Sequence, residues 1–192
     1  MVSFYDYLKL LLPKITNELV ICTLAGVSRQ WFDLKRPDGN LYTVYMAGAT
    51  PIALGLALAL PHRRVISLDS DGSLLMGLTI LPVVAQQDPS NLIIIVCDNE
   101  SYGAIDGLPT HTAGAACLAG IARESGIRNV VEVKELTEFQ KAIDDAFKAN
   151  GSSFIVAKVK QSHQPSPHKL PHALDNKFQL VRYMETTENR SK

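Results

Sequence analysis

Cysteine is scarce in this chain, and charge of neither sign is in excess. Cys22, Cys97 and Cys117 are isolated from one another in the sequence. This usage fits a protein of the reducing cytosol, so we expect a cytoplasmic location. It also argues against a cysteine-ligated iron–sulfur cluster or zinc knuckle within the chain. Lys and Arg together number 19, as do Asp and Glu, and this balance does not indicate a nucleic-acid-binding or membrane-surface protein.

Long apolar segments and glycine-rich nucleotide motifs are also missing. The longest apolar candidate, residues 47–61, is too short to cross a bilayer and contains Pro51. The N-terminal segment contains Asp6 and has no cleavage-like ending, which is not typical of a secretory signal. No Gly-x-Gly-x-x-Gly or P-loop follows the first expected strand, so an unrelated nucleotide-binding domain ranks last among the alternatives. With 192 residues, 46% of them hydrophobic, we expect one domain with a sizeable core.

Strands and helices alternate along the chain. Apolar runs predict strands at residues 18–23, 42–45, 65–68, 92–96, 130–133 and 154–159. Helical spacing predicts helices at residues 3–12 (N-cap Ser3), 29–34, 50–60, 114–125 and 137–149 (N-cap Thr137), with one more helix between the third and fourth strands. The predicted fold class is α/β, a doubly wound and mainly parallel sheet with helices on both faces. We expect residues 1–160 to form this domain and residues 161–192 to form an extended C-terminal connector and tail.

Polar residues follow two of the expected strands directly. Asp71-Gly72-Ser73 comes after the third strand, and residues 98–103 (Asp-Asn-Glu-Ser-Tyr-Gly) come after the fourth. Ligands of open α/β sheets bind at the carboxyl ends of strands, and oxygen ligands from Asp71 and Asn99 would suit Mg²⁺ there. The cation could hold a diphosphate, with the amides of Gly72 and Ser73 directed at the same oxygens. Taken singly, the first cluster is more often only a turn with a helix cap, and the second is ordinary loop chemistry.

The pair of clusters resembles the signature of thiamine diphosphate (ThDP) enzymes, Gly-Asp-Gly-Ser followed at this distance by Asn-Asn. Here it is Ser70-Asp71-Gly72-Ser73 and Asp98-Asn99, so the first residue of each half departs from the family pattern. The resemblance implies that the side chains of Asp71 and Asn99 and the backbone carbonyl of Ser101 bind Mg²⁺. It implies that the cofactor site also includes Gly48, Gly72, Ser73, Tyr102, Gly103, Ala104 and Ile105.

Two further segments resemble the same superfamily. Residues 45–55 are similar to the segment before the signature, which places Met46 where an apolar side chain wedges between the two rings of ThDP. The alternative is that Met46 only fills the core. Ala104 and Ile105 occupy positions that face the reactive carbon in the family. His111 could bind the substrate or transfer a proton, or could be an ordinary surface residue.

Residues 107–113 and the strand at residues 153–160 look like the cofactor-binding half of sulfopyruvate decarboxylase and phosphonopyruvate decarboxylase, and the similarity covers roughly residues 1–160. The resemblance implies a substrate that is a three-carbon 2-oxo acid with an anionic group on C3, with sulfopyruvate, converted to sulfoacetaldehyde and CO2, favoured. In this superfamily an essential glutamate comes from a second, pyrimidine-binding domain, for which a chain already filled by one sheet has no room. We therefore expect a β-type subunit, inactive alone, that needs an α-type pyrimidine-domain partner in an α2β2 or larger hetero-oligomer. The open alternatives are a two-subunit ThDP carboligase and a degenerate, non-catalytic subunit that binds a partner without the cofactor.

Overall fold

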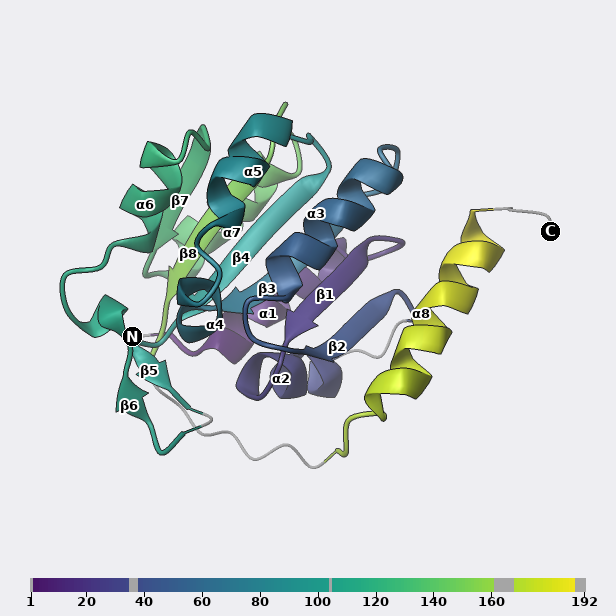
Figure 1. The fold of residues 1–192 in the computed structure, drawn as a ribbon, viewed down its shortest axis with the longest axis horizontal. Coiled ribbons are helices and arrows are strands. Elements are labelled where there is room, and N and C mark those ends of the chain that lie inside the picture. Colours follow the sequence, from purple (N-terminus) through teal and green to yellow (C-terminus); the bar gives the residue numbers. More distant parts are fainter. Residues whose placement is uncertain (1, 35–37, 104, 161–167, 189–192) are drawn as a thin grey trace.

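The computed structural model describes residues 2–34, 38–103, 105–160 and 168–188. They form a six-stranded parallel sheet in the order β2-β1-β3-β4-β8-β7 and a separate antiparallel ribbon, β5-β6 (Figure 1). The strands are β1 (Leu19–Thr23), β2 (Asn40–Val44), β3 (Val65–Ser70), β4 (Leu92–Asp98), β5 (Ser101–Tyr102), β6 (Leu108–Pro109), β7 (Asn129–Val133) and β8 (Ser153–Lys158). The helices are α1 (Phe4–Leu11), η1 (Leu12–Lys14), α2 (Gly26–Leu34), α3 (Ala49–Ala59), α4 (Asp71–Leu75), α5 (Ile80–Gln87), η2 (His111–Ala113), α6 (Leu118–Glu124), α7 (Leu136–Ala146) and α8 (Ala173–Thr187), with η1 and η2 as 3₁₀ turns.

Helices cover both faces of the sheet, which explains why the central strands are continuous apolar runs. Alternate residues of β4 enter opposite hydrophobic clusters, with Ile93 and Ile95 on one face and Ile94 and Val96 on the other. Helices α1, α2 and α7 complete the first cluster, and α3, α5 and α6 complete the second. Figure 1 shows α3 and α5 in front of the sheet and α1 and α7 behind it. The predicted doubly wound α/β fold is confirmed.

Most predicted elements are present, with differences at their ends. Ser3 caps α1 as predicted, because its hydroxyl accepts a hydrogen bond from the Asp6 amide at 3.2 Å. Thr137 does not cap α7; Glu135 holds that position, and the Glu138 carboxylate accepts from the Glu135 amide at 3.2 Å. The single helix predicted between β3 and β4 is two helices, α4 and α5. The helix predicted from residue 114 begins only at Leu118, because η2 and a loop come first.

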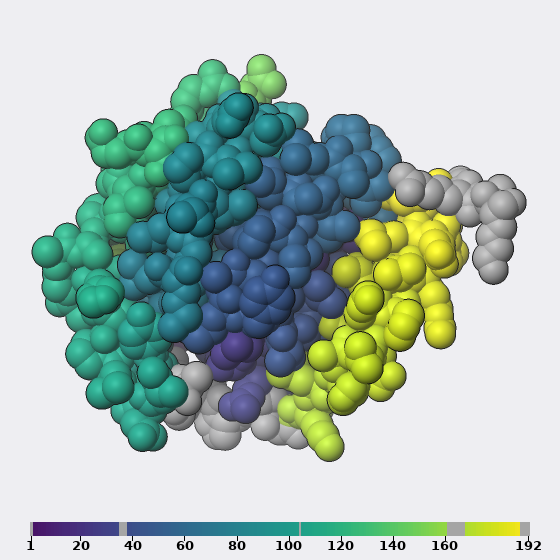
Figure 2. Space-filling model, viewed as in Figure 1, coloured from purple at the N-terminus to yellow at the C-terminus, as the bar shows by residue number. Residues whose placement is uncertain are grey.

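The C-terminal segment differs from the extended tail predicted for it, because residues 173–187 form helix α8. This helix, which is yellow in Figures 1 and 2, lies against β2, the edge strand of the sheet. The buried Asn176 amide accepts from the Tyr42 backbone N–H at 2.7 Å and donates to the Asn40 carbonyl at 2.9 Å. Asn176 therefore pairs with the strand edge much as a neighbouring strand would, and Leu180 adds an apolar contact.

The parallel arrangement brings the carboxyl ends of β1, β3 and β4 to one edge of the sheet. β3 pairs with both of the other strands, with Ser70 opposite Cys97 at the end of the β3–β4 ladder. The loops that leave these strands build the candidate site. Within the described residues, we find no helix with the length and hydropathy needed to span a membrane.

Candidate functional site

Asp71 is the first residue of α4, directly after β3, and it is fully buried. Its Oδ2 accepts hydrogen bonds from Thr110 Oγ1 at 2.6 Å and from Thr112 Oγ1 at 3.2 Å. Its Oδ1 is buried and has no hydrogen-bond partner. Burial raises the pKa of Asp71 and nearby Asp98 adds to the rise, while the hydrogen bond from Thr110 opposes it. A carboxylate oxygen left bare in such a place suits a bound cation, which would supply the missing partner.

Asn99 and Ser101 form the turn that leaves β4. Asn99 Oδ1 accepts from the Ser101 amide at 3.1 Å, and the Ser101 carbonyl accepts from the Gly103 amide at 3.1 Å. Glu100 between them has a φ of 59°, a left-handed conformation that costs a non-glycine residue about 1–2 kcal/mol. Each oxygen retains a second lone pair, so both could still bind a cation. One carboxylate, one amide and one carbonyl oxygen are a suitable donor set for Mg²⁺.

Gly72 and Ser73 organise the start of α4. A Cβ on Gly72 would lie 2.5 Å from the Tyr102 ring, so this position requires glycine for the close approach of β5. The Ser73 hydroxyl accepts from Thr23 Oγ1 at 3.0 Å and from the Ala47 amide at 3.1 Å. The Ser73 amide donates to Ser70 Oγ at 3.3 Å. The diphosphate contact predicted for that amide would therefore compete with an existing helix cap.

The two departures from the family signature both have structural partners. Ser70, in place of glycine, is the N-cap of α4. Asp98, in place of asparagine, is buried and forms an ion pair with Lys158, whose Nζ lies 3.0 Å from Asp98 Oδ2. Neither change removes an oxygen of the predicted cation site.

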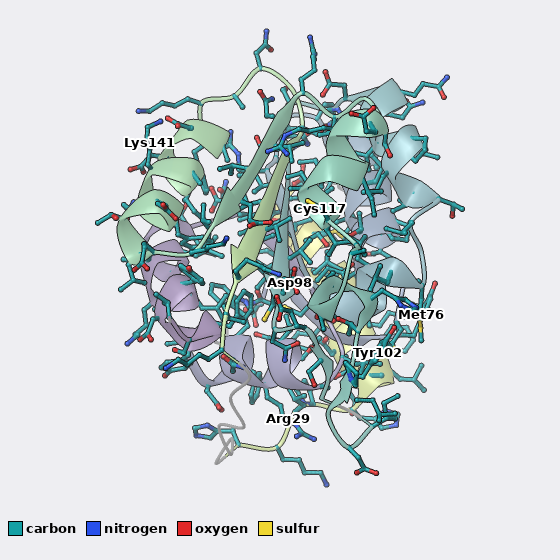
Figure 3. All side chains as sticks on the ribbon, turned by 90° about the vertical axis from the view of Figure 1, so that its left-hand side faces the viewer. Arg29, Met76, Asp98, Tyr102, Cys117 and Lys141 are labelled. Carbon is teal, nitrogen blue, oxygen red and sulfur yellow. The ribbon has the colours of Figure 1, made fainter. Side chains whose placement is uncertain are left out.

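Residues from several of these segments line a cavity of about 390 Å³. Its lining includes the predicted residues Met46, Gly72, Ser73, Asn99, Ser101, Tyr102 and Gly103, together with Thr23, Leu24, Ala25, Gly26, Val27, Arg29, Gln30, Ser70 and Cys97. Asp71 lies beneath this surface and does not line the cavity itself. Figure 3 shows Arg29 and Tyr102 in the lower part of the view and Asp98 near its centre, with Lys141 at the upper left.

The loop from β1 into α2 was not predicted to belong to the site. Residues 23–27 line the cavity together with the signature residues, and Ala25 there has a φ of 62°. Ala47, next to Met46, also has a left-handed φ, of 66°. The sequence signal for this loop was the small pair Ala25-Gly26. The pair follows the buried strand β1 at the same end of the sheet as Asp71.

Several predicted residues lie elsewhere. His111 is exposed on η2 and does not line the cavity, although its neighbours Thr110 and Thr112 bind Asp71. Ile105 is 54% exposed and is also outside the lining. Gly48 lies at the N-cap of α3, packed against Val44 and Tyr45. Ala104 lies outside the described residues. The functional roles of these residues remain predictions.

The fold is a domain of the doubly wound class, and its candidate site lies at the carboxyl ends of the strands. Residues 25–157 match the family model "Thiamine pyrophosphate enzyme, C-terminal TPP binding domain". The chain therefore belongs to the thiamine pyrophosphate (thiamine diphosphate) enzymes, as the signature predicted. Their cofactor is the group that this site would hold.

Three relatives show how the chain compares with whole proteins. It is 27% identical to the sulfopyruvate decarboxylase subunit beta of Methanococcus maripaludis over 91% of this chain and 94% of the relative. It is 30% identical to the phosphonopyruvate decarboxylase of Streptomyces hygroscopicus over 83% of this chain but only 40% of the relative. Among solved structures, the thiamine diphosphate-dependent 4-hydroxybenzoylformate decarboxylase of Rhodococcus jostii superposes with a TM-score of 0.71 at 21% identity, covering 84% of this chain and 33% of that one. The last similarity supports the fold.

Proposed function

We propose that this chain is the diphosphate- and Mg²⁺-binding β-type subunit of a two-subunit ThDP-dependent decarboxylase. Its substrate would be a three-carbon 2-oxo acid with an anionic group on C3, with sulfopyruvate favoured, giving sulfoacetaldehyde and CO2. The observation that carries the proposal is the buried, unpartnered Asp71 Oδ1 at the carboxyl end of β3, between the cavity-lining Ser70 and Gly72, in a chain with this family match. The similarity over nearly the full length of a sulfopyruvate decarboxylase β subunit supports the substrate.

The residues have distinct proposed tasks. Asp71 Oδ1, Asn99 Oδ1 and the Ser101 carbonyl hold Mg²⁺, which in turn holds the diphosphate. Met46, half-buried and lining the cavity, contacts the cofactor rings. Tyr102 and Gly103 close one wall. When bound, thiamine diphosphate supplies an electron sink for the decarboxylation.

A partner subunit would supply the essential glutamate. None of the described residues that line the cavity is a glutamate. Glu18 lies directly before β1, at the end of that strand away from the site, and its carboxylate accepts from the Thr16 and Asn17 amides. The phosphonopyruvate decarboxylase relative, of which this chain spans 40%, has length for a further domain. These facts support a pyrimidine-domain partner of α type, and we propose an α2β2 or larger assembly.

Exposed apolar side chains support a partner surface around the cavity. Tyr45 beside Met46 is 67% exposed, Met76 after α4 is 60% exposed and Ile105 after β5 is 54% exposed. Each of them lies within three positions in the chain of a residue that lines the cavity, and exposed apolar side chains of this kind are typical of a surface that another subunit covers. Their burial would also exclude water from the reaction. The three free cysteines support a cytoplasmic location.

The test is CO2 release from sulfopyruvate with Mg²⁺ and ThDP, by this chain alone and with the pyrimidine-domain protein encoded beside it. Activity only in the mixture would support both the split enzyme and the substrate. An inactive mixture that still binds ThDP would contradict sulfopyruvate and direct the assay to phosphonopyruvate and to carboligation with an acceptor aldehyde. A mixture that binds no ThDP would contradict the whole proposal and favour a non-catalytic subunit.

A further inference from the structure

A charged pair connects β8 to the turn that holds two of the proposed metal ligands. Asp98 and Lys158 end β4 and β8 and lie opposite each other in the parallel ladder. Lys158 Nζ lies 3.0 Å from Asp98 Oδ2 and 2.6 Å from Glu100 Oε1. The Asp98 side chain is only 2% exposed, and that of Lys158 is 21% exposed. A carboxylate buried this deeply needs a compensating charge, and Lys158 supplies it.

The pair reaches Asp71 through Thr112. Thr112 Oγ1 lies 2.7 Å from Asp98 Oδ1 and 3.2 Å from Asp71 Oδ2. Each threonine hydroxyl has a single hydrogen, so the shortest contacts, Thr110 to Asp71 and Thr112 to Asp98, use both of them. Lys158 therefore orients Asp98, and Asp98 takes the Thr112 hydrogen. The Thr112 oxygen lies 2.8 Å from Thr110 Oγ1, and the Thr110 hydroxyl donates to Asp71 Oδ2.

The same pair also holds the backbone of the turn. The Glu100 amide donates to Asp98 Oδ1 at 3.2 Å, and the Thr110 amide donates to the Glu100 carbonyl at 3.1 Å. Asn99 and Ser101 lie on either side of Glu100, whose left-handed φ needs such support. Both halves of the proposed cation site thus depend on one ion pair.

We infer that Lys158 and Asp98 form a positioning pair for the divalent cation. Through Thr112 and the 98–101 turn, they keep Asp71 Oδ2 occupied, leave Asp71 Oδ1 for the metal, and hold Asn99 and Ser101 beside it. This inference rests on the proposed metal-binding function. Neither residue of the pair is a proposed ligand, and their effect on the cation is indirect.

The test is the affinity for Mn²⁺ of the complex between this chain and its pyrimidine-domain partner in the presence of ThDP, measured from the electron paramagnetic resonance signal of free Mn²⁺. Mn²⁺ accepts the same oxygen ligands as Mg²⁺. Lys158→Met leaves Asp98 buried without its cation, and we expect the dissociation constant for Mn²⁺ to rise about tenfold or more. Lys141→Met is the matched control, because Lys141 is exposed on α7 and pairs only with Asp145 among the described residues. We expect this control to bind Mn²⁺ as the unchanged chain does.

A double variant distinguishes positioning from simple loss of a lysine. Asp98→Asn alone places a side-chain amide against the ammonium of Lys158, so it should also weaken Mn²⁺ binding. Asp98→Asn with Lys158→Met removes both charges but keeps an oxygen that accepts from Thr112. We expect the double variant to recover most of the affinity lost by Lys158→Met.

The free energy of unfolding of each variant, measured in urea, completes the test. Lower stability with unchanged Mn²⁺ affinity in Lys158→Met would show a purely structural pair and overturn the inference. Failure of the double variant to recover Mn²⁺ binding while remaining folded would also overturn it. If the unchanged complex binds no Mn²⁺ with ThDP, the proposed metal site itself is wrong, and the inference is wrong with it.

Discussion

Asp71 has an arrangement that is costly for a folded protein unless a ligand uses it. Its carboxylate is fully buried, and one oxygen has no hydrogen-bond partner. Leaving a buried polar atom unsatisfied costs about 1–3 kcal/mol. The neighbouring threonines satisfy only the other oxygen. Among the described residues, Asp71 Oδ1 is one of six buried side-chain atoms without a hydrogen-bond partner and the only carboxylate oxygen of the six, which supports the proposal that a cation binds there.

Asp71→Ala should abolish Mg²⁺-dependent ThDP binding and leave the fold intact. The substitution removes the proposed ligand, and it also removes a buried carboxylate whose pKa burial has raised. Binding is measured by calorimetry on the complex with the partner, and the fold by circular dichroism. An unfolded variant, or one with unchanged affinity for ThDP, would contradict the assignment of Asp71 as a ligand.

Gly72→Ala should destabilise the protein by about 1–3 kcal/mol, since its Cβ would lie 2.5 Å from the Tyr102 ring. Gly55→Ala is the matched control: Gly55 lies inside α3, and nothing within 4 Å would meet the added Cβ. That control should stabilise the protein by about 0.5–1 kcal/mol. Urea unfolding measures both, and equal effects at the two positions would contradict the close packing described for Gly72.

At the scale of elements, one edge of the sheet is covered by a helix. Helix α8 covers β2 at one edge, where Asn176 bonds to the strand backbone. The end of this helix is also tied to the domain, because Arg63 lies 3.0 Å from Glu188 and donates to Thr187. Helix α8 thus covers the edge strand β2. The next strand in the sheet is β1, and the loop that follows β1 lines the cavity.

Asn176→Leu should lower the free energy of unfolding by about 1–3 kcal/mol, because the Tyr42 N–H and the Asn40 carbonyl lose their partner in a buried place. Gln179→Ala, on the exposed side of the same helix, should change stability by less than about 0.5 kcal/mol. Urea denaturation followed by tryptophan fluorescence is a suitable readout, because Trp31 is buried and donates to Asn40. Similar losses in both variants would indicate a general effect on α8 and contradict the specific role of Asn176.

At the scale of the whole molecule, Asp88 links the loops that precede β4, β7 and β8. These loops lie at the amino ends of the strands, away from the cavity. It ends α5, forms an ion pair with Arg128 before β7, and accepts from the Ser152 amide before β8 at 2.9 Å. Burial alone would raise the pKa of Asp88, but the hydrogen bonds from Arg128 and Ser152 outweigh it and lower the pKa below its usual value.

The lowered pKa of Asp88 predicts a contribution to acid stability. Its ionised form is favoured in the folded state, so this stability is present above the unfolded-state pKa of 3.8 and is lost as the pH falls through the folded-state pKa. Asp88→Asn should therefore be less stable than the unchanged protein at pH 7, and the difference should shrink as the pH falls below about 4. Urea unfolding across this range is the measurement, and a difference that does not depend on pH would contradict the prediction.

The sequence by itself determined the class of the fold and the central part of the site. Apolar runs such as Leu92–Val96 predicted buried parallel strands, because burial on both faces leaves no polar alternation. Asp71 and Asn99 directly follow two such strands, so their meeting at one sheet edge followed from topology alone. The family of the chain could be predicted for the same reason, since its signature lies in these local segments.

Only the tertiary structure decided which distant residues support that site. Thr110 and Thr112 bind Asp71, and Lys158 binds Asp98, across separations for which no local pattern exists. The β1–α2 loop lines the cavity because of strand order, and its small residues have no distinctive spacing. Helix α8 likewise follows a segment rich in Pro and His and carries its one buried amide at Asn176, a contact that only β2 explains. Local propensity and hydrophobic period predict elements, whereas hydrogen bonds between elements depend on where the completed fold places each side chain.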